Sequence, residues 1–342
     1  MRLLIVTQAV DIQDPILGFF HRWIEEIAKN CEQVHVICLK EGSHTLPKNV
    51  QVHSLGKEGG RSRVKYVRRF YSYIWNLRHE YDAVLVHMNQ EYVLLGGLLW
   101  RLAGKRVVLW RNHKIGSLWT NIACAIAHAV CYTSEAAYVA HAKNGIRMPI
   151  GIDTETFIPR GTAPTGSILF LGRLDPVKNV HVVVAALTHL YEMGQTFVAA
   201  LYGSPTDPKS KYAHDVRNQA AVLALEGVLS VHEAVLNSEA ARLYAEHAIY
   251  VNLTPSGSFD KTIGEAMAAG AIVVAMNDAI RSVVPEEIFV QDESVESTTR
   301  ALKAALSLSP ESRARIIDVS RKYIHEQHSL ARLMQTLLPL LH

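Results

Sequence analysis

The chain has few cysteines and no long apolar run. Four of its 342 residues are cysteine, none in a CxxC pair. All four stand within apolar runs, which favours buried free thiols in a reducing compartment over a metal site: Cys31, Cys38, Cys124 and Cys131. Arg101 interrupts the apolar stretch 92–104, and the start "MRLLIVTQ" is too short for a secretion signal. We therefore expect a cytoplasmic protein that is dissolved or rests on a membrane surface.

Several catalytic motifs are also missing. No GxGxxG follows an expected strand, and there is no Walker A loop, no GxSxG elbow and no HExxH; the "HEQH" at 325–328 has the wrong spacing. These absences argue against hydride transfer, nucleotide hydrolysis and serine hydrolysis. No nucleic-acid-binding module is recognisable either.

The composition is that of a globular protein with substantial cores. About half of the residues (49%) are hydrophobic and 20% are charged, and the length favours two domains. The net charge of +3 is unevenly spread: residues 1–160 hold 20 Lys/Arg and 13 Asp/Glu, and residues 161–342 hold 15 and 19. A basic first half suggests an anionic partner there, although chance drift of surface charge explains it equally well.

Short apolar strands alternate with amphipathic helices through the whole chain, which predicts doubly wound parallel sheets. In the first half we expect strands at 2–8, 33–39, 51–56, 82–88, 106–112 and 129–134, with helices that include 18–31 and 62–81. "PRGTAPTGS" (159–167) is typical of a linker, and the pattern restarts after it. We expect two Rossmann-like domains, 1–158 and 159–320, with a last helix at about 321–342 that packs back on the first domain.

Two loops of the second half carry charged groups directly after strands. In "LGRLDPVKNV" (171–180), Arg173 and Lys178 flank a turn and could hold a diphosphate, or could simply be exposed cations. In "PSGSFDKTIGEAMAAGA" (255–271), a helix that starts near Asp260 would present free amides to an anion, with Glu265 one turn further on. Plain helix capping is the alternative there. Together the loops favour a ligand with phosphates and hydroxyls, such as a nucleotide sugar.

These stretches resemble the retaining glycosyltransferases of family 4, which have the GT-B fold. "ILFLGRLDPVKNV" is similar to the strand-GRL-x3-K signature of that family, and "GEAMAAGAIVVA" (264–275) to its glutamate helix and following strand. "CYTSEAA" (131–137), "IGIDTETFIP" (150–159) and the "DPILGFF" loop (14–20) match further family stretches in order. The resemblance extends over nearly the whole chain.

The resemblance implies a role for each matching position. Arg173 and Lys178 would neutralise the donor diphosphate, Glu265 would bind the ribose, and His113 in "WRNHK" would face the transferred sugar unless it is an ordinary loop histidine. Backbone contacts to phosphate or base would come from Gly18, Lys261, Thr262, Ile263, Val231 and His232. Because the two cations replace a divalent ion, no metal or other cofactor is expected.

One position departs from the family pattern. The family often has a first glutamate, and the corresponding position is Gly257. We expect Asp260 to bind the sugar hydroxyls instead. The implied function is metal-independent, retaining hexosyl transfer from a nucleotide sugar to a glycan or lipid-linked acceptor, as in polysaccharide biosynthesis. The alternatives are another GT-B enzyme, such as an epimerase or phosphorylase, and a non-catalytic nucleotide-sugar sensor.

The segment 62–81 predicts a partner surface. It interleaves aromatic residues with the cations Arg63, Lys65, Arg68, Arg69 and Arg78, and Arg61 directly precedes it. Such a helix could lie on an anionic membrane, which would place the protein at the inner face of the plasma membrane. Packing of the aromatic residues on the sheet is the alternative, and nucleic acid is not an expected partner.

Overall fold

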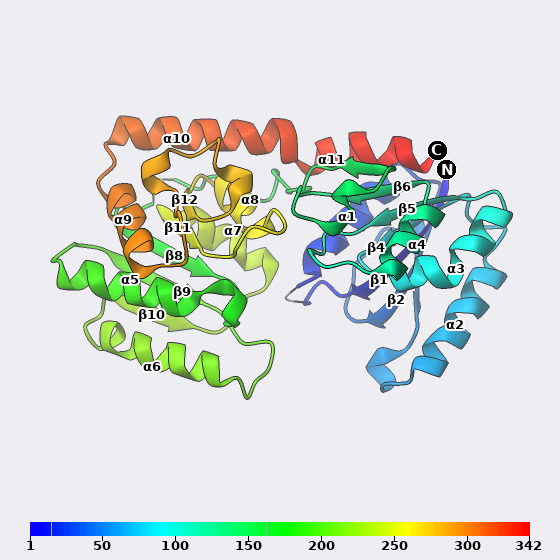
Figure 1. Cartoon of the computed structure of the whole chain (residues 1–342), viewed down its shortest axis with the longest axis horizontal. Coiled ribbons are helices and arrows are strands. Elements are labelled where there is room, and N and C mark those ends of the chain that lie inside the picture. Colours follow the sequence, from blue (N-terminus) through cyan, green and yellow to red (C-terminus); the bar gives the residue numbers. More distant parts are fainter. Residues whose placement is uncertain (15, 162) are drawn as a thin grey trace. The chain divides into compact units, whose positions relative to one another are not determined.

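The computed structural model describes residues 1–14, 16–161 and 163–342. They form two compact units: Met1–Gly151 with Leu330–His342 (unit 1), and Ile152–Ser329 (unit 2). Both are α/β structures, coloured along the chain in Figure 1. Pro15 of the expected glycine loop and Thr162 of the expected linker lie outside the described residues.

Unit 1 contains a seven-stranded sheet in the order β3-β2-β1-β4-β5-β6-β7. Its paired strands run parallel, which confirms the predicted fold class for this half. The strands are β1 (Arg2–Val10), β2 (Gln33–Glu41), β3 (Val50–Ser54), β4 (Ala83–His87), β5 (Arg106–Trp110), β6 (Ala129–Tyr132) and β7 (Gly145–Arg147).

Helices cover both faces of this sheet because its central strands are apolar on both sides. On β1, Leu3 and Ile5 pack in one core cluster, and Leu4 and Val6 in another. The first cluster is closed by α1 (Gly18–Ala28) and α11 (Leu330–Leu337). The second is closed by α2 (Arg63–Asn76), α3 (Gln90–Leu102) and α4 (Leu118–Ile126).

Unit 2 contains a five-stranded parallel sheet in the order β10-β9-β8-β11-β12. Its strands are β8 (Ser167–Leu171), β9 (Val198–Tyr202), β10 (Leu229–His232), β11 (Ile249–Asn252) and β12 (Ile272–Ala275). Its helices are α5 (Val180–Glu192), α6 (Lys211–Leu225), α7 (Asn237–Glu246), α8 (Lys261–Ala268), α9 (Val295–Leu306) and α10 (Pro310–Tyr323). The two parallel α/β sheets confirm the fold class of the whole chain.

Some boundaries differ from the sequence-based expectations for local reasons. The helix after the loop 171–180 begins at Val180, because Pro176–Lys178 forms a 3₁₀ turn and Asn179 takes φ 49°. The segment before the expected linker belongs to unit 2, where the buried Phe157 packs against Tyr244 with ring centroids 6.0 Å apart. A packing contact of this kind leaves no periodic pattern in the sequence.

Candidate active site

The two charged loops of unit 2 follow neighbouring strands. β8 and β11 pair in parallel at the centre of the sheet, so their carboxyl ends lie at the same edge. The loop after β8 carries Arg173 and Lys178, and the loop after β11 leads into α8. This strand order brings together residues about eighty positions apart in the sequence.

Lys178 contacts the loop after β11 directly. Its Nζ donates to Asp260 Oδ2 at 2.5 Å and to Thr254 Oγ1 at 3.0 Å. The Lys178 side chain is 13% exposed and that of Asp260 14%, so the ion pair is largely shielded from water. The predicted cation is therefore held next to the start of α8.

Asp260 is the N-cap of α8, and its carboxylate accepts from the Thr262 amide. It also accepts from the Thr262 hydroxyl at 3.0 Å, from Thr254 Oγ1 at 3.1 Å and from Asn252 Nδ2 at 3.2 Å. Burial raises the pKa of the Asp260 carboxyl, but the Lys178 charge and these hydrogen bonds outweigh burial and hold the pKa well below its usual range. Asp260 is thus ionised.

Arg173 has a separate acidic partner. Its guanidinium lies 2.8 Å from Asp175 Oδ2 and donates to Thr206 Oγ1 at 3.1 Å. Burial raises the pKa of Asp175, but hydrogen bonds from Thr206 and the charges of Arg173 and Lys178 lower it overall. The charges of both predicted cations, Arg173 and Lys178, therefore act on the Asp175 carboxylate. Arg173 is 41% exposed, which leaves its guanidinium accessible from solvent.

The first two turns of α8 hold the remaining charged residues of this stretch, Lys261 and Glu265. Glu265 is 6% exposed, and burial raises the pKa of its carboxyl, with the Lys261 charge opposing the change. For the Lys261 ammonium group burial has the opposite effect and lowers the pKa, while the charge of Glu265 opposes this lowering. The amide of Thr262 donates to the Asp260 side chain and that of Ile263 to the Asp260 carbonyl. Both amides, expected to contact phosphate, are thus engaged within the helix cap.

The residues expected near the base lie on the edge strand β10. The His232 ring stacks on Tyr202 with centroids 4.4 Å apart and an interplanar angle of 15°. The His232 carbonyl accepts from the Gly203 amide at 3.1 Å. Val231 is 36% exposed. These contacts place an aromatic pair at the carboxyl ends of β9 and β10.

Two sequence profiles match the chain, one in each half. The profile described as "Glycosyl transferases group 1" matches residues 165–307, and "Glycosyl transferase 4-like" matches residues 16–113. The chain belongs to the group 1, GT4-like glycosyltransferases. Among curated protein sequences, none matches this glycosyltransferase significantly.

Solved structures with the same fold cover nearly the whole glycosyltransferase. Sucrose-phosphate synthase from Thermosynechococcus elongatus has a TM-score of 0.78 at 17% identity, with 99% of this chain and 98% of that chain covered. Anabaena HepE in complex with UDP and glucose has a TM-score of 0.76 at 16% identity, with the same coverage. An Escherichia coli structure described as "Trehalose-6-phosphate … bound with UDP-2-fluoro glucose" has a TM-score of 0.73 at 12% identity, with 99% of both chains covered. These matches confirm the GT-B-like fold.

The other two predicted site residues of the glycosyltransferase belong to unit 1. Gly18 begins α1 behind a turn closed by Asp14, and a Cβ atom on Gly18 would lie 3.0 Å from the Ile12 carbonyl oxygen. His113 follows β5, and its Nδ1 lies 3.0 Å from the Ile115 amide nitrogen. Nδ1 also lies 2.9 Å from the Ile115 carbonyl oxygen, and only a protonated Nδ1 can donate to a carbonyl, so the two contacts require different tautomers. The roles of both residues remain predictions.

Sequence reasoning missed the polar residues that hold the two cations. Thr206 binds Arg173, and Asn252 and Thr254 surround the Lys178–Asp260 pair. Asn252 ends the apolar strand β11 and Thr254 follows it. Polar residues at the carboxyl end of a parallel strand indicate a ligand site and could have identified both. Within residues 1–14, 16–161 and 163–342, no group of three or more His, Cys, Asp or Glu could hold a metal ion. Metal independence stays a prediction.

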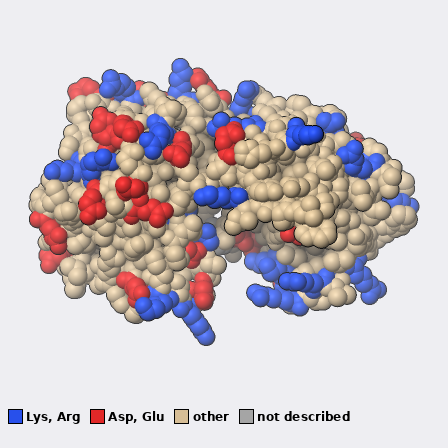
Figure 2. All heavy atoms as spheres, in the orientation of Figure 1, with Lys and Arg blue, Asp and Glu red and all other residues tan. Residues whose placement is uncertain are grey.

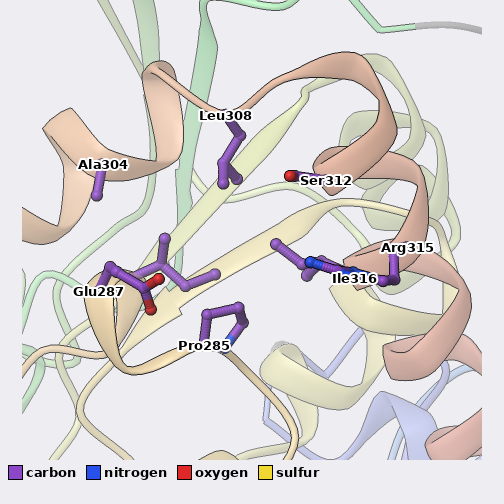
Figure 3. A pocket seen from close by; sticks show the side chains of 8 residues that line it. Pro285, Glu287, Ala304, Leu308, Ser312, Arg315 and Ile316 are labelled. Atoms are coloured by element: carbon purple, nitrogen blue, oxygen red, sulfur yellow. The ribbon is translucent and has the colours of Figure 1, made fainter.

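A separate pocket of unit 2 contains none of these residues. It lies between the Glu286–Ile288 turn and the helices α9 and α10, with Glu287 and Arg315 among its lining residues (Figure 3). The predicted site and this pocket are therefore distinct features of unit 2.

Proposed function

We propose that the chain is a retaining hexosyltransferase that moves a sugar from a nucleotide diphosphate sugar to a hydroxyl of a glycan or lipid-linked glycan. The observation that carries this proposal is the meeting of Arg173, Lys178 and α8 at the carboxyl edge of one sheet. Two cations, one of them with an accessible guanidinium, suit a diphosphate, and the buried Glu265 one turn into α8 suits ribose hydroxyls.

The structural relatives support a hexose donor. HepE is described in complex with UDP-glucose, and the Escherichia coli structure carries UDP-2-fluoro glucose. Both share the fold of this chain over almost its full length. We therefore propose a nucleotide-activated hexose as the donor.

The reaction needs no protein nucleophile. The bond between the sugar C1 and the diphosphate oxygen breaks while the acceptor oxygen bonds to C1 on the same face, so the anomeric configuration is retained. The acceptor proton passes to the departing diphosphate, which leaves as a nucleoside diphosphate. Arg173 and Lys178 stabilise the charge that develops on this leaving group, the task that a divalent ion performs in other transferases. His113 Nε2 is proposed to face the sugar.

A lipid-linked acceptor is supported by the outer face of α2, α3 and α4. α2 has no acidic residue, and in Figure 2 Lys and Arg side chains gather where Figure 1 shows this helix. Neighbouring helices expose large apolar side chains, with Leu102 86% and Trp119 62% exposed. The Tyr71 hydroxyl of α2 donates to the Leu95 carbonyl of α3, so these two helices are neighbours. That combination suits an anionic lipid surface.

Membrane contact would be peripheral. Within the part of the chain that the structure describes, no helix has the length and apolar character to cross a bilayer. On α2, Phe70 and Ile74 pack in the core, while Trp75 is 65% exposed. Some apolar residues of this helix therefore pack on the sheet, and others are accessible to a membrane surface. We propose attachment to the inner face of the plasma membrane.

Binding and turnover assays test the proposed function. One of UDP, GDP and ADP should raise the melting temperature, because a ligand that binds only the folded state stabilises it. With the matching nucleotide sugar, the nucleoside diphosphate should be released only when a hydroxyl acceptor is added. Conversion of the nucleotide sugar without an acceptor would indicate an epimerase, a requirement for phosphate a phosphorylase, and tight binding without turnover a sensor.

A further inference from the structure

The Asp260 carboxylate is surrounded by donors from its own chain. Oδ2 accepts from Lys178, Asn252 and Thr254, and Oδ1 accepts from the amide and hydroxyl of Thr262. A carboxylate offers about four lone-pair sites, and five donors already point at these two oxygens. The carboxylate therefore has no capacity left for the hydroxyls of a sugar.

We propose that Asp260 is a positioning residue that fixes Lys178 for the donor diphosphate, and not a ligand of the transferred sugar. This inference rests on the proposed function, since it presumes that Lys178 meets a diphosphate. It replaces the role expected for Asp260 at the position where the family glutamate is absent.

The geometry leaves Lys178 one donor for the substrate. An ammonium group has three N–H donors, and Asp260 and Thr254 take two of them. The third can meet a phosphate oxygen without breaking either contact. Lys178 is thus held before the donor arrives, and the conformational entropy of its long side chain is not lost again on binding.

The neighbours of Asp260 keep it in place for this task. Asn252 terminates β11 and Thr262 lies in the first turn of α8, so the carboxylate is bound to two regular elements of unit 2. The lowered pKa of Asp260 keeps its carboxylate charged at neutral pH. A rigid, permanently charged partner suits the orientation of a catalytic cation.

A double-mutant cycle tests the proposal. Asp260→Asn removes the charge but keeps a good N-cap, because Asn caps helices about as well as Asp. We expect this change to lower kcat by about tenfold when Lys178 is present and by less than about twofold in the Lys178→Met background. An equal loss in both backgrounds would show that Asp260 acts on the substrate independently of Lys178, and would overturn the proposal.

Binding of the nucleoside diphosphate alone provides a second readout. The probe is whichever of UDP, GDP or ADP stabilises the wild type, measured by calorimetry. We expect Asp260→Asn to change its Kd by about threefold or more, and Lys178→Met to abolish that effect. An unchanged Kd for the diphosphate, combined with weaker binding of the nucleotide sugar, would identify a sugar contact and overturn the proposal.

Two further variants keep the outcome interpretable. Asp278→Asn is the matched control, because Asp278 is an exposed acid after β12 that is hydrogen-bonded to Ser256 of the loop that carries Asp260. It should change kcat by less than about twofold. If Asp260→Asn does not fold, Thr254→Val removes the other Lys178 partner, and we expect a kcat loss of about threefold that disappears without Lys178.

Failure of the proposed function has a different signature. If no nucleoside diphosphate binds the wild type, both the function and this inference fall. If the wild type binds and turns over, but the cycle is additive for Asp260 and for Thr254, only the inference falls.

Discussion

The carbonyl oxygen of Gly172 lies 2.1 Å from the position that a Cβ atom would take on Gly203. The Gly172 amide also donates to the Tyr202 carbonyl at 3.1 Å, so the ends of β8 and β9 meet backbone to backbone. Arg173 directly follows this contact, so the close approach of the two glycines sets the backbone position from which the Arg173 side chain extends.

Gly203→Ala should displace the loop that carries Arg173. Since the obstacle is backbone, we expect the substitution to cost about 1–3 kcal/mol of unfolding free energy and to lower kcat. Denaturant unfolding and turnover measure the two effects. Gly59→Ala is the control, because nothing lies within 4 Å of its Cβ position, and it should change neither. A Gly203→Ala enzyme with wild-type stability would contradict the close approach.

Arg173→Ala and Lys178→Ala should each lower kcat by roughly 10²–10³, as expected for loss of one group that stabilises transition-state charge. Steady-state release of the nucleoside diphosphate measures the effect. Lys211→Ala is a matched control, since Lys211 is a 90% exposed lysine of unit 2. Near-normal turnover of either site variant would refute its assignment to the diphosphate.

The sequence predicted which loops carry the charged candidate residues, but not the contacts between residues that are far apart in the sequence. Arg173, Lys178 and Glu265 follow strands whose apolar pattern is clear, and the structure places them on loops and a helix at one sheet edge. The sequence did not predict the contact of Lys178 with Asp260, because it depends on the pairing of β8 with β11. Local periodicity does not reveal the order of strands in a sheet, so the partners of Arg173 and Lys178 could be identified only from the structure.

The Lys178–Asp260 pair should make stability depend on pH in a defined window. The pKa of Asp260 is lowered in the folded state, so the ionised carboxylate stabilises the fold above its unfolded pKa of about 4, and the contribution is lost as the pH falls below that value. We expect Asp260→Asn to lower the unfolding free energy of unit 2 by about 2–4 kcal/mol at pH 7.

Urea unfolding between pH 3 and pH 7 measures this difference. The gap between wild type and Asp260→Asn should be constant above about pH 5 and should shrink below about pH 4. A gap that is equally large at pH 3 would mean that the charge of Asp260 does not stabilise the fold. Asp278→Asn should stay within about 0.5 kcal/mol of wild type at pH 7.

The exposed face of α2, α3 and α4 should bind anionic vesicles through both charge and apolar contact. We expect the 342-residue chain to co-sediment with vesicles of phosphatidylcholine and phosphatidylglycerol at moderate salt, and less at high salt, because screening weakens the attraction. Replacing Arg63, Lys65 and Arg68 with Glu should abolish binding. Leu102→Ser with Trp119→Ser should weaken it about tenfold or more, since both side chains are largely exposed.

Matched substitutions in unit 2 distinguish binding through this surface from nonspecific adsorption to vesicles. Leu225 is 89% exposed on α6 and Lys211 begins the same helix, so Leu225→Ser with Lys211→Glu alters equally exposed groups outside the proposed surface. Vesicle binding of that variant should equal wild type. Equal losses in both variants, or no binding of the wild type to anionic vesicles, would remove the membrane from the proposed function and leave a dissolved glycan as the acceptor.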